Sequence, residues 1–224
     1  MFSFIYYFLV AFLNKNMKIN NQNTDGIKLP LVEEFFTIQG EGFHSGKAAY
    51  FIRLGGCDVG CSWCDSRFSW DPDLHPLVDT DIIVKNVVNS GTDSVVVTGG
   101  EPLFWNLDYL CKCFKNKNIR TSIETSGAYP LSGRWDWICL SPKKSLPPDN
   151  DICIMADELK VIIQKQEDFD WAEKYRRVVS NKCKLYLQPE WSRFEKIIPL
   201  IVEYVKRDPV WSISLQIHKF MHIP

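Results

Sequence analysis

The sequence predicts an α/β domain in which parallel strands form the core and helices lie outside. Short apolar, β-rich runs alternate along the chain with amphipathic stretches at helical spacing, and polar turns follow several of the runs. Strands that alternate with helices pair in parallel, because each helix carries the chain back across the sheet. The carboxyl ends of such strands share one edge, so we expect the polar turns to converge at one mouth.

The elements follow one another in roughly six such units. The runs predicted as strands are 31–38, 49–54, 94–97, 120–124, 137–140, 157–163, 185–187 and 212–217. The stretches predicted as helices are 80–90, 107–115, 168–179 and 194–206.

Composition limits the class of protein. With 224 residues, of which 46% are hydrophobic, the chain is long enough to bury one core, and nothing in it marks a second domain. The formal net charge of -1 and the lack of a Lys/Arg block argue against a nucleic-acid partner. Eight cysteines without a regular disulfide framework indicate a reducing cytoplasm.

The first thirty residues read as a leader. Residues 1–13 are almost wholly apolar, but they are too few to span a bilayer, and they lack the basic start and the cleavage site of a signal peptide. We therefore expect no stable membrane association. A polar run follows Met17 and has the composition of a flexible segment. We expect 1–30 to be disordered or a mis-assigned start, with translation beginning at Met17, and 31–224 to be the domain.

Three cysteines form the most informative motif. Cys57, Cys61 and Cys64 have the spacing C-x3-C-x2-C, so a short loop can turn their thiolates toward one point. Three ligands are one short of the shell of an ordinary 4Fe-4S or structural zinc site, so either another residue completes it or one metal position stays open. A zinc knuckle with a distant fourth ligand is the alternative, although no second cysteine or histidine pair supplies that ligand. A disulfide fits poorly, because three cysteines cannot all pair with one another.

Other polar features interrupt the predicted strands. Arg53 lies in an apolar strand, so its guanidinium is either paired with a carboxylate in the core or pointed into a cavity to hold an anion. The 39–42 turn contains glycines that allow close approach to a ligand, although a simple hairpin uses the same residues. The 99–102 turn exposes backbone after a strand, although its proline also suits a helix start. We interpret the remaining cysteines and four tryptophans as core residues: Cys111, Cys113, Cys139, Cys153, Cys183, Trp135, Trp137, Trp171 and Trp211.

The cysteine motif resembles that of the radical S-adenosylmethionine (SAM) enzymes, in which three thiolates hold a 4Fe-4S cluster and SAM chelates the fourth iron. The segments FTIQGEG at 36–42, AYFIRL at 49–54 and SLQIHKFMHIP at 214–224 are similar to those of the 7-carboxy-7-deazaguanine synthases, which serve queuosine and related deazapurine biosynthesis. The similarity runs from about residue 32 to residue 224. It implies the partial (β/α)6-type barrel of the radical SAM superfamily.

The resemblance also implies a reaction. It is a lyase reaction that contracts the ring of 6-carboxy-5,6,7,8-tetrahydropterin to 7-carboxy-7-deazaguanine and releases ammonia. One-electron cleavage of SAM would give a 5'-deoxyadenosyl radical, which takes a hydrogen from C6 and later recovers it, so that SAM is not consumed. Mg²⁺, a homodimer and a flavodoxin- or ferredoxin-like electron donor are implied as well.

Two other functions compete with this one. A glycyl-radical activase would share the cysteine motif and the G-G-E-P turn at 99–102, but not the Q-G-E-G turn, Arg53 and the Q-x-H-K tail together. A non-enzymatic iron-sulfur or zinc scaffold would not need a mouth lined for a cofactor.

The resemblance also implies which residues bind the cluster, the pterin and SAM. The cluster would be held by Cys57, Cys61 and Cys64, which we take as catalytic. The pterin would contact Ile38, Gln39, Gly40, Glu41, Arg53, Thr98, His218 and Pro224. SAM would be lined by Trp63, Cys64, Asp65, Gly100, Glu101, Ser126, Ser141, Pro142, Lys143 and Gln188.

The resemblance implies a specific role for two further groups, the Ser66 hydroxyl and the Pro224 carboxylate. Mg²⁺ would bind the hydroxyl of Ser66, where the family more usually has threonine, and serine offers the same hard oxygen without the β-methyl group. The carboxylate of Pro224 would itself reach the pterin and accept hydrogen bonds from its N–H groups.

Overall fold

The structure, a computed structural model, describes residues 25–224. The apolar 1–13 segment and the start expected at Met17 lie outside these residues. Within 25–224, no helix is both long and apolar enough to cross a membrane.

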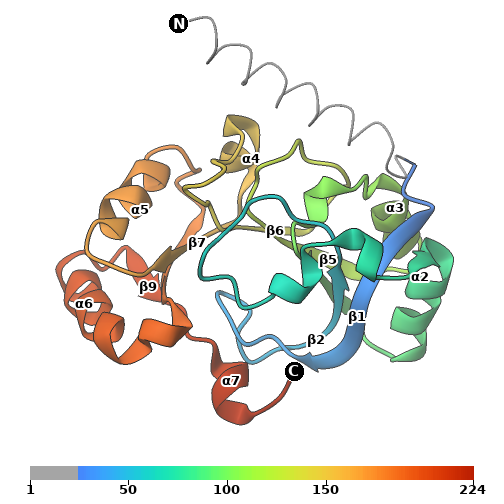
Figure 1. Cartoon of the computed structure of the whole chain (residues 1–224), viewed down its shortest axis with the longest axis horizontal. Coiled ribbons are helices and arrows are strands. Elements are labelled where there is room, and N and C mark those ends of the chain that lie inside the picture. The colour runs from blue at the N-terminus through green and yellow to red at the C-terminus, as the bar shows by residue number, and fades with distance from the viewer. Residues whose placement is uncertain (1–24) are drawn as a thin grey trace, which may run out of the picture.

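One sheet of nine strands runs through residues 25–224 (Figure 1). Its order is β3-β1-β2-β4-β5-β6-β7-β8-β9. The strands from β2 to β9 pair in parallel, whereas β1 is antiparallel to both of its neighbours. The bounds are β1 Lys28–Ile38, β2 Ala48–Leu54, β3 Leu77–Asp79, β4 Ser94–Gly99, β5 Arg120–Thr125, β6 Trp137–Leu140, β7 Glu158–Ile163, β8 Lys184–Pro189 and β9 Trp211–Ile213.

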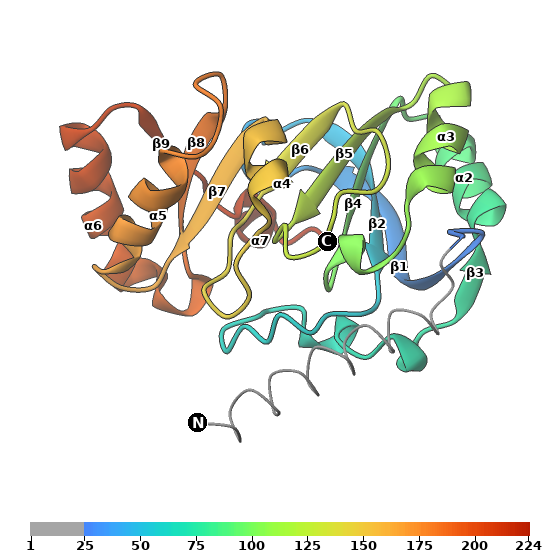
Figure 2. The ribbon, with the colours of Figure 1, turned by 90° about the horizontal axis from the view of Figure 1, so that it is seen from above.

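Helices cover the outer face of this curved sheet, with α2 and α3 at one end and α5 and α6 at the other (Figure 2). The α-helices are α2 Thr80–Asn89, α3 Asp108–Asn116, α4 Asn150–Met155, α5 Asp168–Arg176, α6 Phe194–Arg207 and α7 Ile217–Met221. Residues 25–224 also contain four 3-10 helices, Arg67–Ser69, Pro72–Leu74, Pro102–Phe104 and Trp191–Arg193. Because β3 and β9 are unpaired with each other, the sheet stays an open, partial barrel, as predicted.

The spacing of apolar residues explains why these segments pack as they do. In α2, Ile83, Val84 and Val87 lie on one face and are buried, and α6 buries Ile197 and Ile201 in the same way. Each such side chain contributes about 1.5–3 kcal/mol through burial. Trp211 is buried at 1% exposure, and Cys111, Cys139, Cys153 and Cys183 are buried too, which confirms their interpretation as core residues.

The structure corrects the predicted elements at three places. β1 begins at Lys28 instead of residue 31, because 28–30 pairs with the unpredicted strand β3. The strand predicted at 212–217 ends at Ile213, and Ile217 instead begins α7, where its N–H donates to the carbonyl of Gly40 at 2.9 Å. The short helix α4, Asn150–Met155, was not predicted and lies between β6 and β7.

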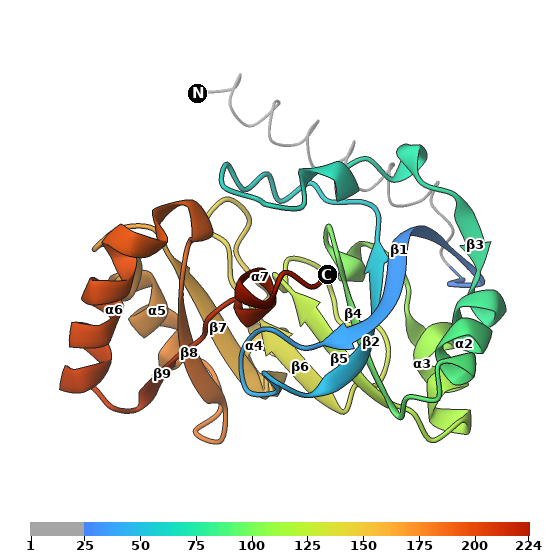
Figure 3. The ribbon, with the colours of Figure 1, turned by 90° about the horizontal axis from the view of Figure 1, so that it is seen from below.

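The last segment occupies the open side of the barrel. Figures 1 and 3 show α7 between the β9 end of the sheet and β1, with the last residues beside β1. The Thr37 hydroxyl of β1 donates to a Pro224 oxygen at 3.1 Å. The end of the chain therefore completes the wall that the sheet leaves incomplete.

Candidate active site

The carboxyl ends of the parallel strands open into one cavity of about 280 Å³. Arg53 lies near the end of β2, Thr98 near the end of β4, Glu124 near the end of β5 and Gln188 near the end of β8, and all four line it. This confirms the expectation that the polar turns share one mouth.

The cavity gathers nearly all residues that the resemblance implicated. Its wall contains Ile38, Gln39, Gly40, Glu41, Arg53, Cys57, Cys61, Trp63, Cys64, Asp65, Ser66, Thr98, Gly100, Glu101, Ser126, Ser141, Lys143, Gln188, His218 and Pro224. Pro142 is the exception. It is buried away from the wall, and its carbonyl accepts a hydrogen bond from the Trp171 indole at 3.2 Å.

The three cysteines of the motif lie half-buried on this wall as free thiols. Within residues 25–224, no three His, Cys, Asp or Glu side chains gather to hold a single metal ion. The Cys57 thiol nevertheless lies near enough to Cys61 and Cys64 for these two groups to raise its pKa. A 4Fe-4S cluster is bound through a different iron by each cysteine, so the thiols need only surround it. The Ser66 N–H and the Trp70 indole N–H both point at the Cys64 sulfur, at 3.4 Å each, as donors to a cluster thiolate would.

Burial favours the protonated form of two of these thiols, Cys57 and Cys61. It raises the pKa of Cys57 to about 11, and it raises the pKa of Cys61 in spite of the nearby Lys143 ammonium. Metal binding requires thiolates, so loading a metal centre here would release protons.

Glu101 joins the turns that follow β4 and β5. Its carboxylate is only 1% exposed and accepts from the backbone N–H of Ser126 at 2.7 Å and of Leu103 at 3.1 Å, as well as from the Thr125 and Ser126 hydroxyls. A side chain with this many donors has a fixed position. Glu101 thus holds the two turns together beside the cysteine loop.

The 39–42 turn is a hairpin between β1 and β2, closed by two hydrogen bonds of 2.8 Å between Gln39 and the 46–47 backbone. Its glycines make room for protein side chains. A Cβ on Gly40 would lie 2.1 Å from the His218 ring nitrogen, and one on Gly42, whose φ is +63°, would lie 1.9 Å from a Glu158 oxygen. His218 therefore sits directly on the turn.

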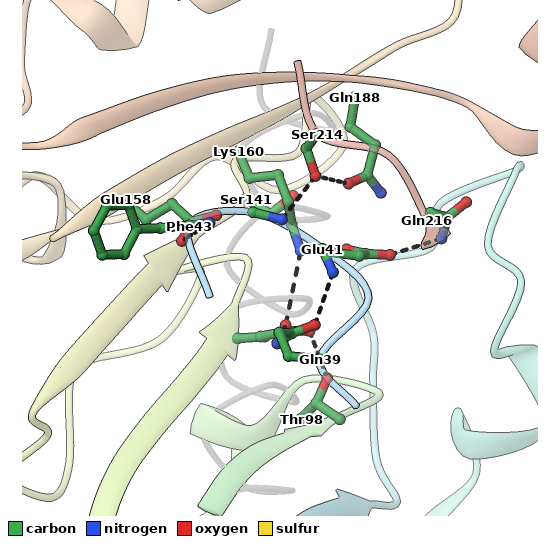
Figure 4. A network of polar contacts seen from close by, with 12 residues as sticks. Gln39, Glu41, Phe43, Thr98, Ser141, Glu158, Lys160, Gln188, Ser214 and Gln216 are labelled. Carbon is green, nitrogen blue, oxygen red and sulfur yellow. Dashed lines mark hydrogen bonds and ion pairs between the residues drawn. The ribbon is translucent and has the colours of Figure 1, made fainter. Parts of the chain in front are cut away.

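A buried cation, Lys160, organises the base of the cavity. Its side chain is almost fully buried on β7, and its ammonium donates to Glu41 and lies 3.8 Å from Glu124. Gln216 donates to Glu41 at 2.8 Å, and Gln39 donates to Glu124 at 2.9 Å. Figure 4 shows Lys160 and Gln216 converging on Glu41 from two sides. The carboxylates offset the cost of burying the ammonium.

These contacts set the charges of Glu41 and Lys160. Burial raises the pKa of Glu41, but Lys160 and the hydrogen bonds from Lys160 and Gln216 outweigh it, so that the pKa ends below its ordinary value. Burial lowers the pKa of Lys160, but Cys139, Glu124 and Glu41 outweigh it and raise the pKa well above its ordinary value. Glu41 is therefore a charged hydrogen-bond acceptor on the cavity wall at neutral pH.

Arg53 points into the cavity, which was one of the two alternatives that the sequence left open, whereas the carboxylate that pairs with it is exposed and does not lie in the core. The Arg53 Nε donates to Glu33 at 2.7 Å, and the side chain also lines the cavity. The contact with Glu33 uses Nε, so the two terminal nitrogens of the guanidinium take no part in it.

Sequence reasoning missed several wall residues, among them Glu124, Lys160, Trp191 and Gln216. One of them carried a usable signal. Lys160 interrupts the apolar strand Glu158–Ile163 just as Arg53 interrupts its own strand.

A partial barrel of parallel strands with a three-cysteine loop at the cavity defines the radical SAM enzymes. A family model described as "Radical SAM superfamily" matches residues 51–139. The 7-carboxy-7-deazaguanine synthase of Flavobacterium psychrophilum is 53% identical over 199 residues, which cover 89% of this chain and 94% of that protein. The enzyme of the same name from Synechocystis sp. is 46% identical over 197 residues, covering 88% and 94%. The chain belongs to the 7-carboxy-7-deazaguanine synthase family.

A solved structure agrees with this assignment. The crystal structure of QueE from Escherichia coli matches with a TM-score of 0.75 at 26% identity, and it covers 84% of this chain and 93% of that one.

Replacing Lys160 by Met should lower the free energy of unfolding by about 3 kcal/mol at pH 7, because a buried carboxylate loses its cation. The loss should shrink at pH 5. In the wild type the lowered pKa of Glu41 stabilises the fold above its unfolded pKa, and this stability fades on acidification. In the variant, burial still raises the pKa of Glu41 while both contributions of Lys160 that lower it are gone, so acidification relieves the destabilisation.

Urea titrations at the two pH values measure this difference. Lys206→Met serves as the control, because Lys206 pairs with Glu203 on the exposed face of α6. A deficit in Lys160→Met that does not change between pH 5 and pH 7 would contradict the assigned charges.

Proposed function

We propose that this chain catalyses the reaction of its family. It contracts the ring of 6-carboxy-5,6,7,8-tetrahydropterin to 7-carboxy-7-deazaguanine, with release of ammonia, in the pathway to queuosine and related deazapurines. The observation that carries the proposal is the single cavity that the three-cysteine loop, residues 38–41 and His218 all line.

Membership of the radical SAM superfamily implies a 4Fe-4S cluster and SAM, which supply one-electron chemistry for hydrogen abstraction. Cys57, Cys61 and Cys64 would hold the cluster. The residues that would orient SAM share a place on the turns around that loop: Trp63, Asp65, Gly100, Ser126, Ser141, Lys143 and Gln188. Glu101 would act on SAM mainly by fixing these turns, since its oxygens already accept several protein hydrogen bonds.

The opposite side of the cavity suits a pterin that carries a carboxylate. Glu41, held charged by Lys160, would accept from the pterin's N–H groups. The terminal nitrogens of Arg53 would bind the substrate carboxylate. Burial lowers the pKa of His218, so its ring would serve as a neutral hydrogen-bond donor beside that carboxylate. Thr98 and a Pro224 oxygen, which Thr37 orients, would complete the contacts.

Four further assignments come from the family. Mg²⁺ would bind at Ser66, whose hydroxyl lies on the cavity wall 3.2 Å from the Asp65 carboxylate. A flavodoxin- or ferredoxin-like protein would supply electrons, the enzyme would be a homodimer, and it would work in the cytoplasm, where an oxygen-sensitive cluster survives.

Anaerobic reconstitution with iron and sulfide tests the function. With dithionite, SAM, Mg²⁺ and 6-carboxy-5,6,7,8-tetrahydropterin, the enzyme should release 7-carboxy-7-deazaguanine and ammonia in equal amounts, as measured by mass spectrometry. A cluster whose reduced EPR spectrum changes with SAM, but which yields no product, would indicate a different radical SAM reaction. A spectrum that ignores SAM would indicate a scaffold.

Cys61→Ala should lose both iron loading and turnover, because no neighbour replaces its thiolate. Cys113→Ala is the matched control, since Cys113 is a free, partly exposed cysteine on α3 outside the cavity wall. Iron and sulfide analysis after reconstitution gives the result. Iron lost from Cys113→Ala and kept by Cys61→Ala would refute the cluster assignment.

Ser66→Ala should remove the dependence of turnover on Mg²⁺, whereas Ser66→Thr should keep it, because threonine presents the same hydroxyl. The measurement is the rate with and without Mg²⁺ after chelator treatment. Equal stimulation of the alanine and threonine variants would place the metal elsewhere.

A further inference from the structure

A chain of hydrogen bonds crosses the cavity wall from its base to the cysteine loop. Lys160 donates to Glu41, and the Gln216 Nε2 donates to the other Glu41 oxygen at 2.8 Å. The Lys219 Nζ donates to the Gln216 Oε1 at 3.0 Å and to the Asp65 carboxylate at 2.7 Å. We refer to these five side chains, Lys160, Glu41, Gln216, Lys219 and Asp65, as the cross-cavity chain.

Gln216 is the link that makes the chain continuous. Its amide donates to a carboxylate on one side and accepts from an ammonium on the other. A carboxylate at this position would repel Glu41, and an apolar side chain would form a hydrogen bond with neither partner, whereas the amide serves both. The amide orientation is thus dictated by its two charged neighbours.

Helix α7, which carries both Lys219 and His218, is also held by the β1–β2 hairpin, where the Ile217 N–H donates to the Gly40 carbonyl at 2.9 Å and His218 packs against Gly40. The helix has no buried residue. Its Phe220 stays 52% exposed while its ring meets those of Trp191 and Phe194 edge-on at 5.3 and 5.6 Å. The Lys219 ammonium joins α7 to the cysteine loop at Asp65, and it also contacts Gln216.

The two ends of the chain belong to different halves of the site. Glu41 and His218, the neighbour of Lys219, face the proposed pterin side. Asp65 lies between Cys64 and Ser66, on the cofactor and metal side. The Lys219–Asp65 ion pair is partly exposed, and pairs of this kind contribute little to stability. We therefore assign this ion pair a role in positioning the two segments that it joins, and not in stabilising the fold.

We propose that Gln216 and Lys219 are positioning residues that couple the two halves of the site, so that pterin binding orders the cofactor side and SAM binding orders the pterin side. The inference rests on the proposed function for the identity of the two ligands. Such coupling is reciprocal, so it is measurable from either ligand.

The test uses the reconstituted holoenzyme with its cluster oxidised, so that no turnover occurs. SAM affinity is measured by calorimetry with and without saturating 6-carboxy-5,6,7,8-tetrahydropterin. In the wild type the pterin should tighten SAM binding about fivefold or more. In Lys219→Met the factor should fall below about twofold, with melting temperature and iron content unchanged. In Gln216→Glu the factor should fall as far, with a lower melting temperature because the new carboxylate repels Glu41.

Two matched variants separate positioning from a general structural effect. Lys219→Arg keeps the cation and should retain most of the coupling. Lys206→Met, which removes a lysine from an exposed ion pair on α6, should retain all of it. Full coupling in Lys219→Met, or none in the wild type, overturns the proposal.

Hydrogen–deuterium exchange of the cluster-free protein gives a second readout, should a variant fail to load iron. Lys219→Met should speed amide exchange in Ile217–Met221 and in the 57–66 loop, compared with Lys206→Met. Unchanged exchange in both segments overturns the proposal. Turnover of the wild type tests the proposed function separately. An enzyme that binds SAM and the pterin cooperatively but makes no product would disprove the proposed reaction and leave the coupling proposal standing.

Discussion

The site depends on one buried ammonium. Lys160 lies almost fully buried on β7, where an unpaired charge would cost several kcal/mol, so Glu41 and Glu124 must stay close to it. Those two carboxylates come from the β1–β2 hairpin and from β5, far apart in the sequence. Pairing with Lys160 therefore fixes the polar base of the cavity and leaves Glu41 charged toward whatever fills it.

The second constraint is the open side of the barrel. A sheet whose edge strands do not pair leaves a gap in its wall, and here the segment after β9 fills it instead of another strand. His218 can pack against the hairpin because Gly40 has no side chain, and Ile217 bonds the Gly40 carbonyl. The same turn thus supports both the buried charge network and the last helix.

The cysteine loop is held from neighbouring turns. A side chain on Gly100 would lie 2.5 Å from the Gly56 carbonyl, so the turn after β4 passes directly against the loop. Glu101 then ties that turn to the one after β5. On the other side, Lys219 reaches Asp65 from α7. The loop is therefore positioned by contacts whose residues come from both halves of the chain.

The sequence by itself determined the alternation of strands and helices, since a buried strand must be apolar and an outer helix must be apolar on one face. It also determined the three-cysteine loop, because ligands this close in sequence stay close in any fold. Arg53 was visible as a charge in an apolar strand, and Lys160 carried the same signal. Only the tertiary structure decided which carboxylates meet Lys160, that Pro142 lies off the cavity wall, and that 217–221 is helical. These features depend on contacts between distant segments, such as Gln216 with Glu41, and local pattern does not encode such pairings.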